Sequence, residues 1–292
     1  MSRKFSTSVS LIAMMAMAAI AAPAGLAVAA PSADEIIDKY IEAIGGEDAL
    51  AKINSRVVKG VFSLVDMGIT ANYENYTQTP DAVNIITIEG MGEIRSGIKD
   101  DVAWEAHFMN GDSILDGARK LSAQRQATIE PLRNWTDWYA SAELDGEATV
   151  GDSAAHKVVF TPKEGDPETI YFDQESGLIV QRDGVGQDGM LASTMISDYR
   201  EVDGVQVAHA IEILGGMTIE ITIESVEQNI DIAADQFDLP TQIAALLNPP
   251  EAAASDEEAT SDEEAASDEE AASDEEAASD EEAASDEGSD HK

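Results

Sequence analysis

The four histidines, His107, His156, His209 and His291, are the side chains best suited to acid–base or metal chemistry, but their spacing supports neither. Zinc sites and zinc proteases use short His-x-x-His or His-Glu-x-x-His patterns, and the chain has neither pattern and no cysteine. It also lacks a G-x-S-x-G nucleophile motif and a phosphate-binding P-loop. Carboxylate pairs are common by chance at a net charge of −41, so no pair marks a glycosidase site. The residue types therefore predict no enzyme, no cofactor and no metal site.

The apolar pattern predicts a mainly β domain that opens with a helix. Ser32 and Glu35 form a capping box, an apolar stripe runs from Ile36 to Ile44, and Gly45-Gly46 ends the helix. A short helical turn follows at residues 47–53. Strands are expected at residues 56–65, 69–77, 82–89, 92–98, 102–108, 147–150, 156–161, 168–172, 178–182, 191–199, 205–214 and 217–226.

Several of these segments alternate between apolar and polar residues. Ile219, Ile221 and Ile223, for example, are separated by polar residues. One apolar and one polar face is typical of an antiparallel sheet curled over a core. About eleven strands with few helices favour a closed or half-open barrel.

An insert at residues 111–139 interrupts the strand pattern. Pro131 is suited to the first turn of a helix in which Leu132, Trp135, Trp138 and Tyr139 share one side. This helix either packs on the sheet or lies across the mouth of the barrel as a lid.

The N-terminus has the pattern of a secretory signal peptide, residues 1–29. Arg3 and Lys4 precede a mostly apolar run at residues 9–22, and Ala27-Val28-Ala29 is a small-residue cleavage site. An uncleaved anchor is the alternative, although Pro23 and Gly25 interrupt the run. Because no cysteine is available for acylation, the mature protein is expected free in the periplasm, or outside the cell, without a lipid anchor.

The C-terminal segment, residues 251–292, repeats Ser-Asp-Glu-Glu-Ala-Ala and holds 19 acidic residues against one lysine. It has no apolar residue larger than alanine, so it cannot bury enough surface to fold and is expected to be a disordered acidic tail. Solvation is its expected role. Calcium binding by its carboxylates is the alternative and would be weak, because no EF-hand loop is present.

The intervening domain, residues 30–250, is acidic as well, with 39 acidic and 14 basic residues. Nucleic-acid binding requires a basic surface, so nucleic acid is not an expected partner.

Five segments occur in a characteristic order along the domain, at residues 40–50 (YIEAIGGEDAL), 57–62 (VVKGVF), 100–105 (DDVAWE), 167–178 (PETIYFDQESGL) and 198–205 (DYREVDGV). This ordered series resembles the LolA/LolB-like superfamily, in particular the branch described as outer membrane lipoprotein-sorting proteins. The resemblance implies an antiparallel half-barrel of eleven strands closed by helices, with an apolar cavity for acyl chains and no enzymatic activity.

The sequence departs from this family at residues 78–81, which read Gln-Thr-Pro-Asp where the best-known lipoprotein carriers have an arginine before the proline. A general binder of lipids or other amphiphiles is therefore as consistent with the sequence as a lipoprotein shuttle.

With the resemblance in mind, we expect the cavity and its lid to be formed by five aromatic residues: Phe62, Trp104, Phe108, Trp135 and Trp138. The resulting hypothesis is a periplasmic carrier of lipoprotein or lipid acyl chains that works with the lipoprotein machinery of the inner and outer membranes. Two alternatives stay open, namely an envelope interaction module with a solid barrel and a calcium-binding protein that acts through its acidic tail.

Overall fold

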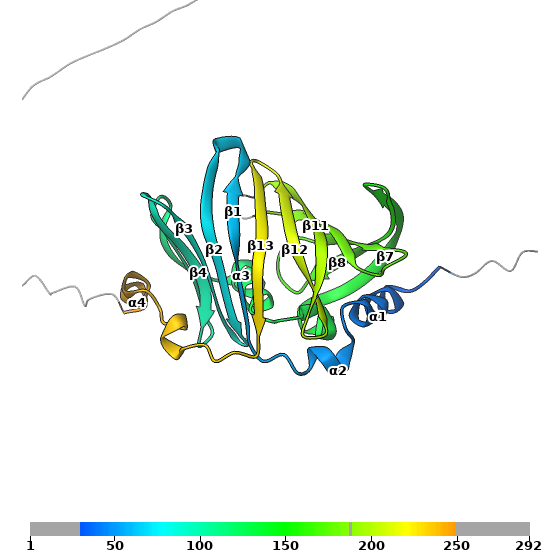
Figure 1. Ribbon diagram of the computed structural model, residues 1–292, viewed down its shortest axis with the longest axis horizontal. Helices are drawn as coiled ribbons and strands as arrows, with labels where there is room; N and C mark the ends of the chain where they lie inside the picture. Colours follow the sequence, from blue (N-terminus) through cyan, green and yellow to red (C-terminus); the bar gives the residue numbers. More distant parts are fainter. Residues whose placement is uncertain (1–29, 187–188, 249–292) are drawn as a thin grey trace, which may run out of the picture. The chain divides into compact units, whose positions relative to one another are not determined.

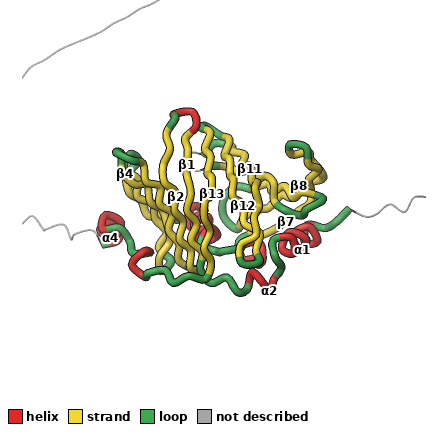
Figure 2. The backbone as a smooth tube through the Cα atoms, viewed as in Figure 1, coloured by secondary structure: helices red, strands yellow, loops and turns green. Residues whose placement is uncertain are grey.

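The computed structural model describes residues 30–186 and 189–248, and the expected signal peptide and acidic tail lie outside these residues. The described part is built on one antiparallel sheet of thirteen strands (Figures 1 and 2). The strands are β1 Arg56–Leu64, β2 Ile69–Gln78, β3 Asp81–Ile88, β4 Gly92–Lys99, β5 Val102–His107, β6 Gly111–Leu115, β7 Tyr139–Val150, β8 Ser153–Pro162, β9 Glu168–Asp173, β10 Ile179–Val185, β11 Leu191–Val202, β12 Val205–Leu214 and β13 Thr218–Gln228.

The helices are short. They are α1 Ala33–Ala43, α2 Glu47–Leu50, α3 Gly117–Gln126 and α4 Thr241–Leu247, with 3-10 segments η1 Val65–Met67, η2 Pro131–Asp137 and η3 Ala234–Phe237. In α1 the side chain of Ser32 accepts a hydrogen bond from the Glu35 backbone, while the Glu35 side chain accepts one from the Ser32 backbone. The predicted capping box is thereby confirmed.

The strand order is β6-β5-β4-β3-β2-β1-β13-β12-β11-β10-β9-β8-β7, so the first and last strands meet in the middle of the sheet. The chain runs from the middle to one edge, crosses to the opposite edge after β6, and returns strand by strand to the middle. Since β6 and β7 each pair with only one strand among the described residues, the sheet is an open half-barrel, as predicted, although it has thirteen strands instead of about eleven.

The crossover from β6 to β7 contains α3 and η2, and this is where the sequence-based expectation was incomplete. The residues expected to form one insert include strand β6, helix α3 and the start of β7, which is twelve residues long instead of the four predicted. The predicted helix at Pro131 is a 3-10 segment. Helix α3 has the sequence GARKLSAQRQ and no fully buried residue, so it carries no apolar stripe that sequence analysis could recognise.

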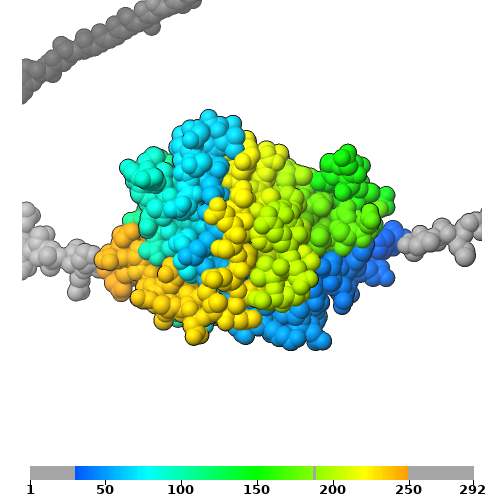
Figure 3. Space-filling model, in the orientation of Figure 1, coloured from blue at the N-terminus to red at the C-terminus, as the bar shows by residue number. Residues whose placement is uncertain are grey.

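Two layers of side chains pack on opposite faces of the sheet. On the inner face, Tyr40 of α1 meets Phe172 of β9 edge-to-face at 5.8 Å, within a cluster that includes Phe160 and Ile170. On the outer face, Phe237 and Ile243 from the C-terminal segment cover Val83 and Trp104. Figure 3 shows β13 (yellow) beside the blue and cyan strands β1 and β2, with the C-terminal helix (orange) at one side of the sheet.

Gly60 lies where β1 pairs with β13, at a register shift between Lys59 and Gly60. A Cβ atom at Gly60 would lie 2.1 Å from the Thr222 carbonyl oxygen and 3.0 Å from the Ile223 Cα, both backbone atoms. The close approach of the two central strands therefore requires glycine at this position.

We predict that Gly60→Ala lowers the free energy of unfolding by about 1–3 kcal/mol, because overpacking at a backbone contact forces the two strands apart. Denaturant unfolding followed by circular dichroism measures the change. Gly184→Ala is the matched control, since its Cβ would meet only the Glu168 Cβ, at 3.5 Å. Equal stability of the two variants would contradict the prediction.

Candidate functional site

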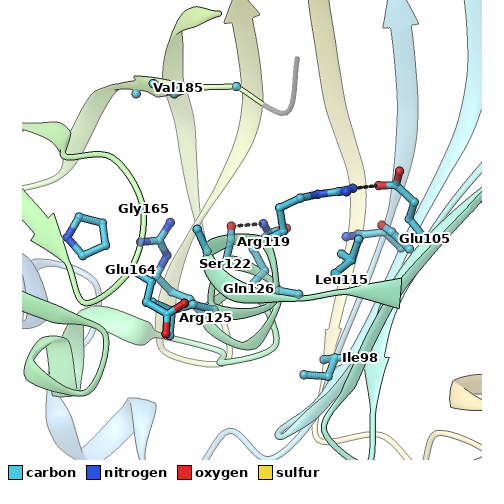
Figure 4. Close-up of a pocket in the computed structure, with 18 of the residues that line it drawn as sticks. Ile98, Glu105, Leu115, Arg119, Ser122, Arg125, Gln126, Glu164, Gly165 and Val185 are labelled. Carbon is cyan, nitrogen blue, oxygen red and sulfur yellow. Dashed lines mark hydrogen bonds and ion pairs between the residues drawn. The ribbon is translucent and has the colours of Figure 1, made fainter. Parts of the chain in front are cut away.

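A cavity of about 350 Å³ lies inside the half-barrel, between α3 and the inner face of the sheet (Figure 4). One wall comes from β3, β4 and β5, and the other from β8, β9 and β10. Helix α3 supplies Arg119, Ser122, Arg125 and Gln126 to its lining. The volume is at the lower end of the range of small-molecule sites.

Ion pairs hold α3 between the two walls of this cavity. Arg119 binds Glu105 of β5 at 2.8 Å, and Lys120 binds Asp101 at 2.6 Å. On the opposite wall Arg125 binds Glu168 of β9 at 2.7 Å. Because α3 contributes no fully buried residue, charge pairs and half-buried contacts hold it, and these are weaker than core packing.

The cavity is polar where α3 covers the sheet. The side chains of Asn75, Asn84, Ser96 and Glu105 are neighbours across β2, β3, β4 and β5. The Asn75 amide donates to the Asn84 side-chain oxygen at 2.9 Å, and the Tyr73 hydroxyl donates to the same oxygen at 3.2 Å. Burial raises the pKa of Tyr73 to about 12, so this hydroxyl stays a neutral donor.

Beyond α3 the same face of the sheet is apolar. One row of cross-strand neighbours consists of Ile69, Leu64, Ile219 and Ile213. The next row consists of Ala71, Phe62, Ile221, Ile211 and Ile196. We refer to these nine residues as the inner apolar rows. Most of them are only partly buried, which leaves aliphatic surface available on the inside of the half-barrel.

Most of the exposed large apolar side chains of the described residues lie on turns, or on the strand residues next to them, at one end of the sheet. The turns are β1–β2, β3–β4, β5–β6, β10–β11 and β12–β13, which share an end because neighbouring strands are antiparallel. Their exposed apolar residues form what we call the apolar rim: Val65, Met67, Met91, Phe108, Met109, Val185, Met190, Leu191, Leu214 and Met217. The inner apolar rows begin beside this rim, at Leu64, Ile69, Ile213 and Ile219.

A second group of polar residues is buried on the inner side. Tyr40 donates its hydroxyl to Glu130 at 3.2 Å, and the Leu132 backbone donates to the same carboxylate at 3.3 Å. Burial raises the pKa of Glu130, although the nearby Arg182 and Arg56 oppose the shift. Burial likewise lowers the pKa of Arg56.

The five aromatic residues predicted for the cavity and lid do not form one site in the structure. Phe62 lies in the inner apolar rows, and Phe108 is exposed on the apolar rim. Trp104 is only 1% exposed and packs with Val83, Phe237 and Ile243, besides touching the cavity. Trp135 and Trp138 are partly buried against the cluster around α1, where Trp135 contacts Phe160 edge-to-face. The role of these five aromatic residues in ligand binding stays a prediction.

Sequence reasoning missed the functional candidates that depend on cross-strand neighbours. The aliphatic residues of β11, β12 and β13 gave a usable signal, since Ile219, Ile221 and Ile223 alternate. Nothing in the local sequence indicated that α3 would lie inside the half-barrel.

Within residues 30–186 and 189–248, no cluster of three or more His, Asp or Glu side chains is arranged to hold a metal ion. None of the helices in these residues has the length and apolar character needed to cross a membrane.

The sequence matches no model of a known protein family and no curated protein. Its fold does match solved structures. A DUF1329 family protein from Desulfovibrio piger is 13% identical, with a TM-score of 0.50 over 70% of this chain and 97% of that one. A LolA superfamily protein from Nitrosomonas europaea is 13% identical, with a TM-score of 0.50 over 72% and 99%.

A domain from Vibrio parahaemolyticus assigned to outer membrane lipoprotein sorting is 8% identical, with a TM-score of 0.50 over 70% of this chain and 97% of that one. At these identities the similarity concerns the fold. It extends over nearly the whole length of each of the three structures. The predicted resemblance is confirmed at this level: the chain has a LolA-like fold.

Proposed function

We propose that the protein is a non-enzymatic periplasmic carrier that binds the acyl chains of a lipid or lipoprotein inside its half-barrel. The observation that carries the proposal is the set of inner apolar rows, whose aliphatic side chains are only partly buried on the inside of the sheet. Apolar surface left in contact with water is costly, and covering it with an acyl chain contributes about 0.8 kcal/mol per buried methylene.

The apolar rim supports the same function, because it gives the ligand an apolar path into the half-barrel. Contiguous exposed apolar surface is unusual in soluble proteins and commonly marks a site of interaction. Methionine makes up much of this rim, and its flexible side chain adapts to ligands of different shape. The lipoprotein-sorting domain among the structural matches has the same fold, which is consistent with a carrier role.

We expect α3 to be the element that moves when ligand enters. It lies over the polar part of the inner face and is held to both walls by ion pairs. Breaking a few partly exposed ion pairs costs far less than exposing a packed core, so α3 is the part of the inner layer that is easiest to displace.

The first prediction concerns the inner apolar rows. Ile221→Asn should weaken binding of the neutral fluorescent probe N-phenyl-1-naphthylamine about tenfold, because it replaces a ligand-facing aliphatic side chain with a polar one. Fluorescence titration measures the dissociation constant. The control is Thr222→Asn, which lies next in sequence on the opposite, exposed face of β13. Equal binding by both variants would argue against ligand binding on this face.

The second prediction concerns α3. The double variant Arg119→Gln, Lys120→Gln should accelerate probe association about fivefold, since it removes two of the ion pairs that hold α3 over the inner face. Stopped-flow fluorescence measures the rate. Arg133→Gln is the control, because it breaks an ion pair with Glu47 that does not involve α3. An unchanged rate in the double variant would mean that α3 does not gate entry.

A further inference from the structure

Arg182 of β10 is the one charged residue in an otherwise uncharged row across the inner face. The row continues the first inner apolar row from Ile213 to Thr194 of β11, then to Arg182, and then to Ile170, Val158 and Leu144. A long cationic side chain thus points to the same side of the sheet as the surface that we propose binds acyl chains. Such a position is costly for an arginine unless its charge is compensated.

The guanidinium of Arg182 has no ion-pair or hydrogen-bond partner among the described residues, and its Nε is buried. Arg56 of β1 is in the same condition, with a buried Nε and no partner within the described part of the chain. The other inner arginine, Arg125, differs because it binds Glu168 at 2.7 Å. Arg119 and Arg200 at the surface also have carboxylate partners.

Arg56 and Arg182 belong to one electrostatic group, although they come from different halves of the sheet. Both interact with the carboxylate of Glu130 and with Tyr40. Glu130 forms no ion pair with either arginine and is instead hydrogen-bonded by Tyr40 and the Leu132 backbone. Glu168, which pairs with Arg125, also interacts with Arg182, and the carboxylates raise the pKa of Arg182 against the effect of burial. Three guanidinium groups, those of Arg56, Arg125 and Arg182, therefore share two carboxylates, Glu130 and Glu168, which leaves an excess of one positive charge.

This excess of positive charge is unexpected in a chain with a net charge of −41. Neutral phenols surround it, because burial raises the pKa of Tyr40, Tyr139 and Tyr199. The hydroxyls of these three tyrosines already donate to Glu130, Glu168 and the Ile179 carbonyl, so the guanidinium N–H groups are the donors that remain for an oxyanion. One bound anion would compensate the buried charge that the described residues leave open.

We propose that Arg182 and Arg56 bind the anionic headgroup of an amphiphile whose chain lies on the inner apolar rows. This inference rests on the proposed carrier function and narrows its ligand to amphiphiles with a carboxylate or phosphate headgroup.

The test compares two competitors of equal chain length, laurate and dodecanol, in displacing N-phenyl-1-naphthylamine from the mature full-length protein. We expect laurate to displace the probe with at least tenfold higher affinity than dodecanol. In Arg182→Met this ratio should fall to about one, with dodecanol binding unchanged. Arg182→Lys should retain part of the preference, because it keeps the charge but loses the planar fork of donors.

Arg200→Gln is the matched control, since Arg200 is exposed and pairs only with Asp198. Thermal unfolding of the ligand-free proteins separates a binding role from a structural one. Because Arg182 forms no ion pair or hydrogen bond with the described residues, Arg182→Met should melt close to the temperature of the parent. A lower melting temperature combined with a retained laurate preference would overturn the inference.

The outcomes also separate this inference from the carrier function. If the probe binds but laurate and dodecanol compete equally in the parent protein, the headgroup site is wrong while the carrier function stands. If the probe does not bind, the carrier function fails, and inorganic phosphate and acetate then test the anion site alone. If phosphate or acetate raises the melting temperature of the parent but not that of Arg182→Met, the site binds a free anion and not a headgroup. If neither anion raises the melting temperature of the parent, the anion site is wrong.

Discussion

The pairing of β1 with β13 is the contact on which the rest of the structure depends. It joins the first and last strands of the sheet and so unites two halves that are otherwise separate meanders. With the first strand fixed in the middle, β6 and β7 become the two edges, and the chain has to cross from one edge to the other. The position of α3 inside the half-barrel follows from this requirement, and its own sequence contributes little to it.

The inner face combines two environments because two kinds of element cover it. Where α1 and η2 pack, the sheet presents large apolar residues such as Phe160 and Phe172, and the interior is well filled. Where α3 lies, the sheet presents amides and carboxylates, and ion pairs take the place of core packing. Between these regions and the apolar rim, aliphatic residues remain partly uncovered. The inner face is thus well filled beside α1 and η2, whereas its aliphatic rows near the apolar rim stay partly uncovered.

The strong negative charge of the chain gives the inner arginines their significance. Acidic residues on the surface are solvated and screened by salt, so their repulsion costs little per residue. A buried cation without a partner costs much more, and surface carboxylates do not compensate it at a distance. Arg125 satisfies this constraint through a direct ion pair with Glu168, whereas Arg56 and Arg182 form no ion pair among the described residues and interact with Glu130 and Glu168 only at longer range. Arg56 and Arg182 therefore have donors free for a bound anion, as proposed above.

The sequence alone determined the elements that local patterns encode. The capping box at Ser32, the alternating strands around Ile221 and the LolA-like order of segments were all predicted, because each depends on residues close together in the chain. The short strand β6, the polar helix α3 and the full length of β7 were not, since none has a distinctive apolar period.

Only the tertiary structure decided which side chains share a site. It separated Trp104 from Trp135 and Trp138, and it placed Arg182 in one row with Ile213 and Ile170. The reason is that cross-strand register brings together residues far apart in sequence, and a shift of one residue would move a side chain to the opposite face. Local patterns fix which strands form, whereas the register between β1 and β13 fixes what the inside of the half-barrel contains.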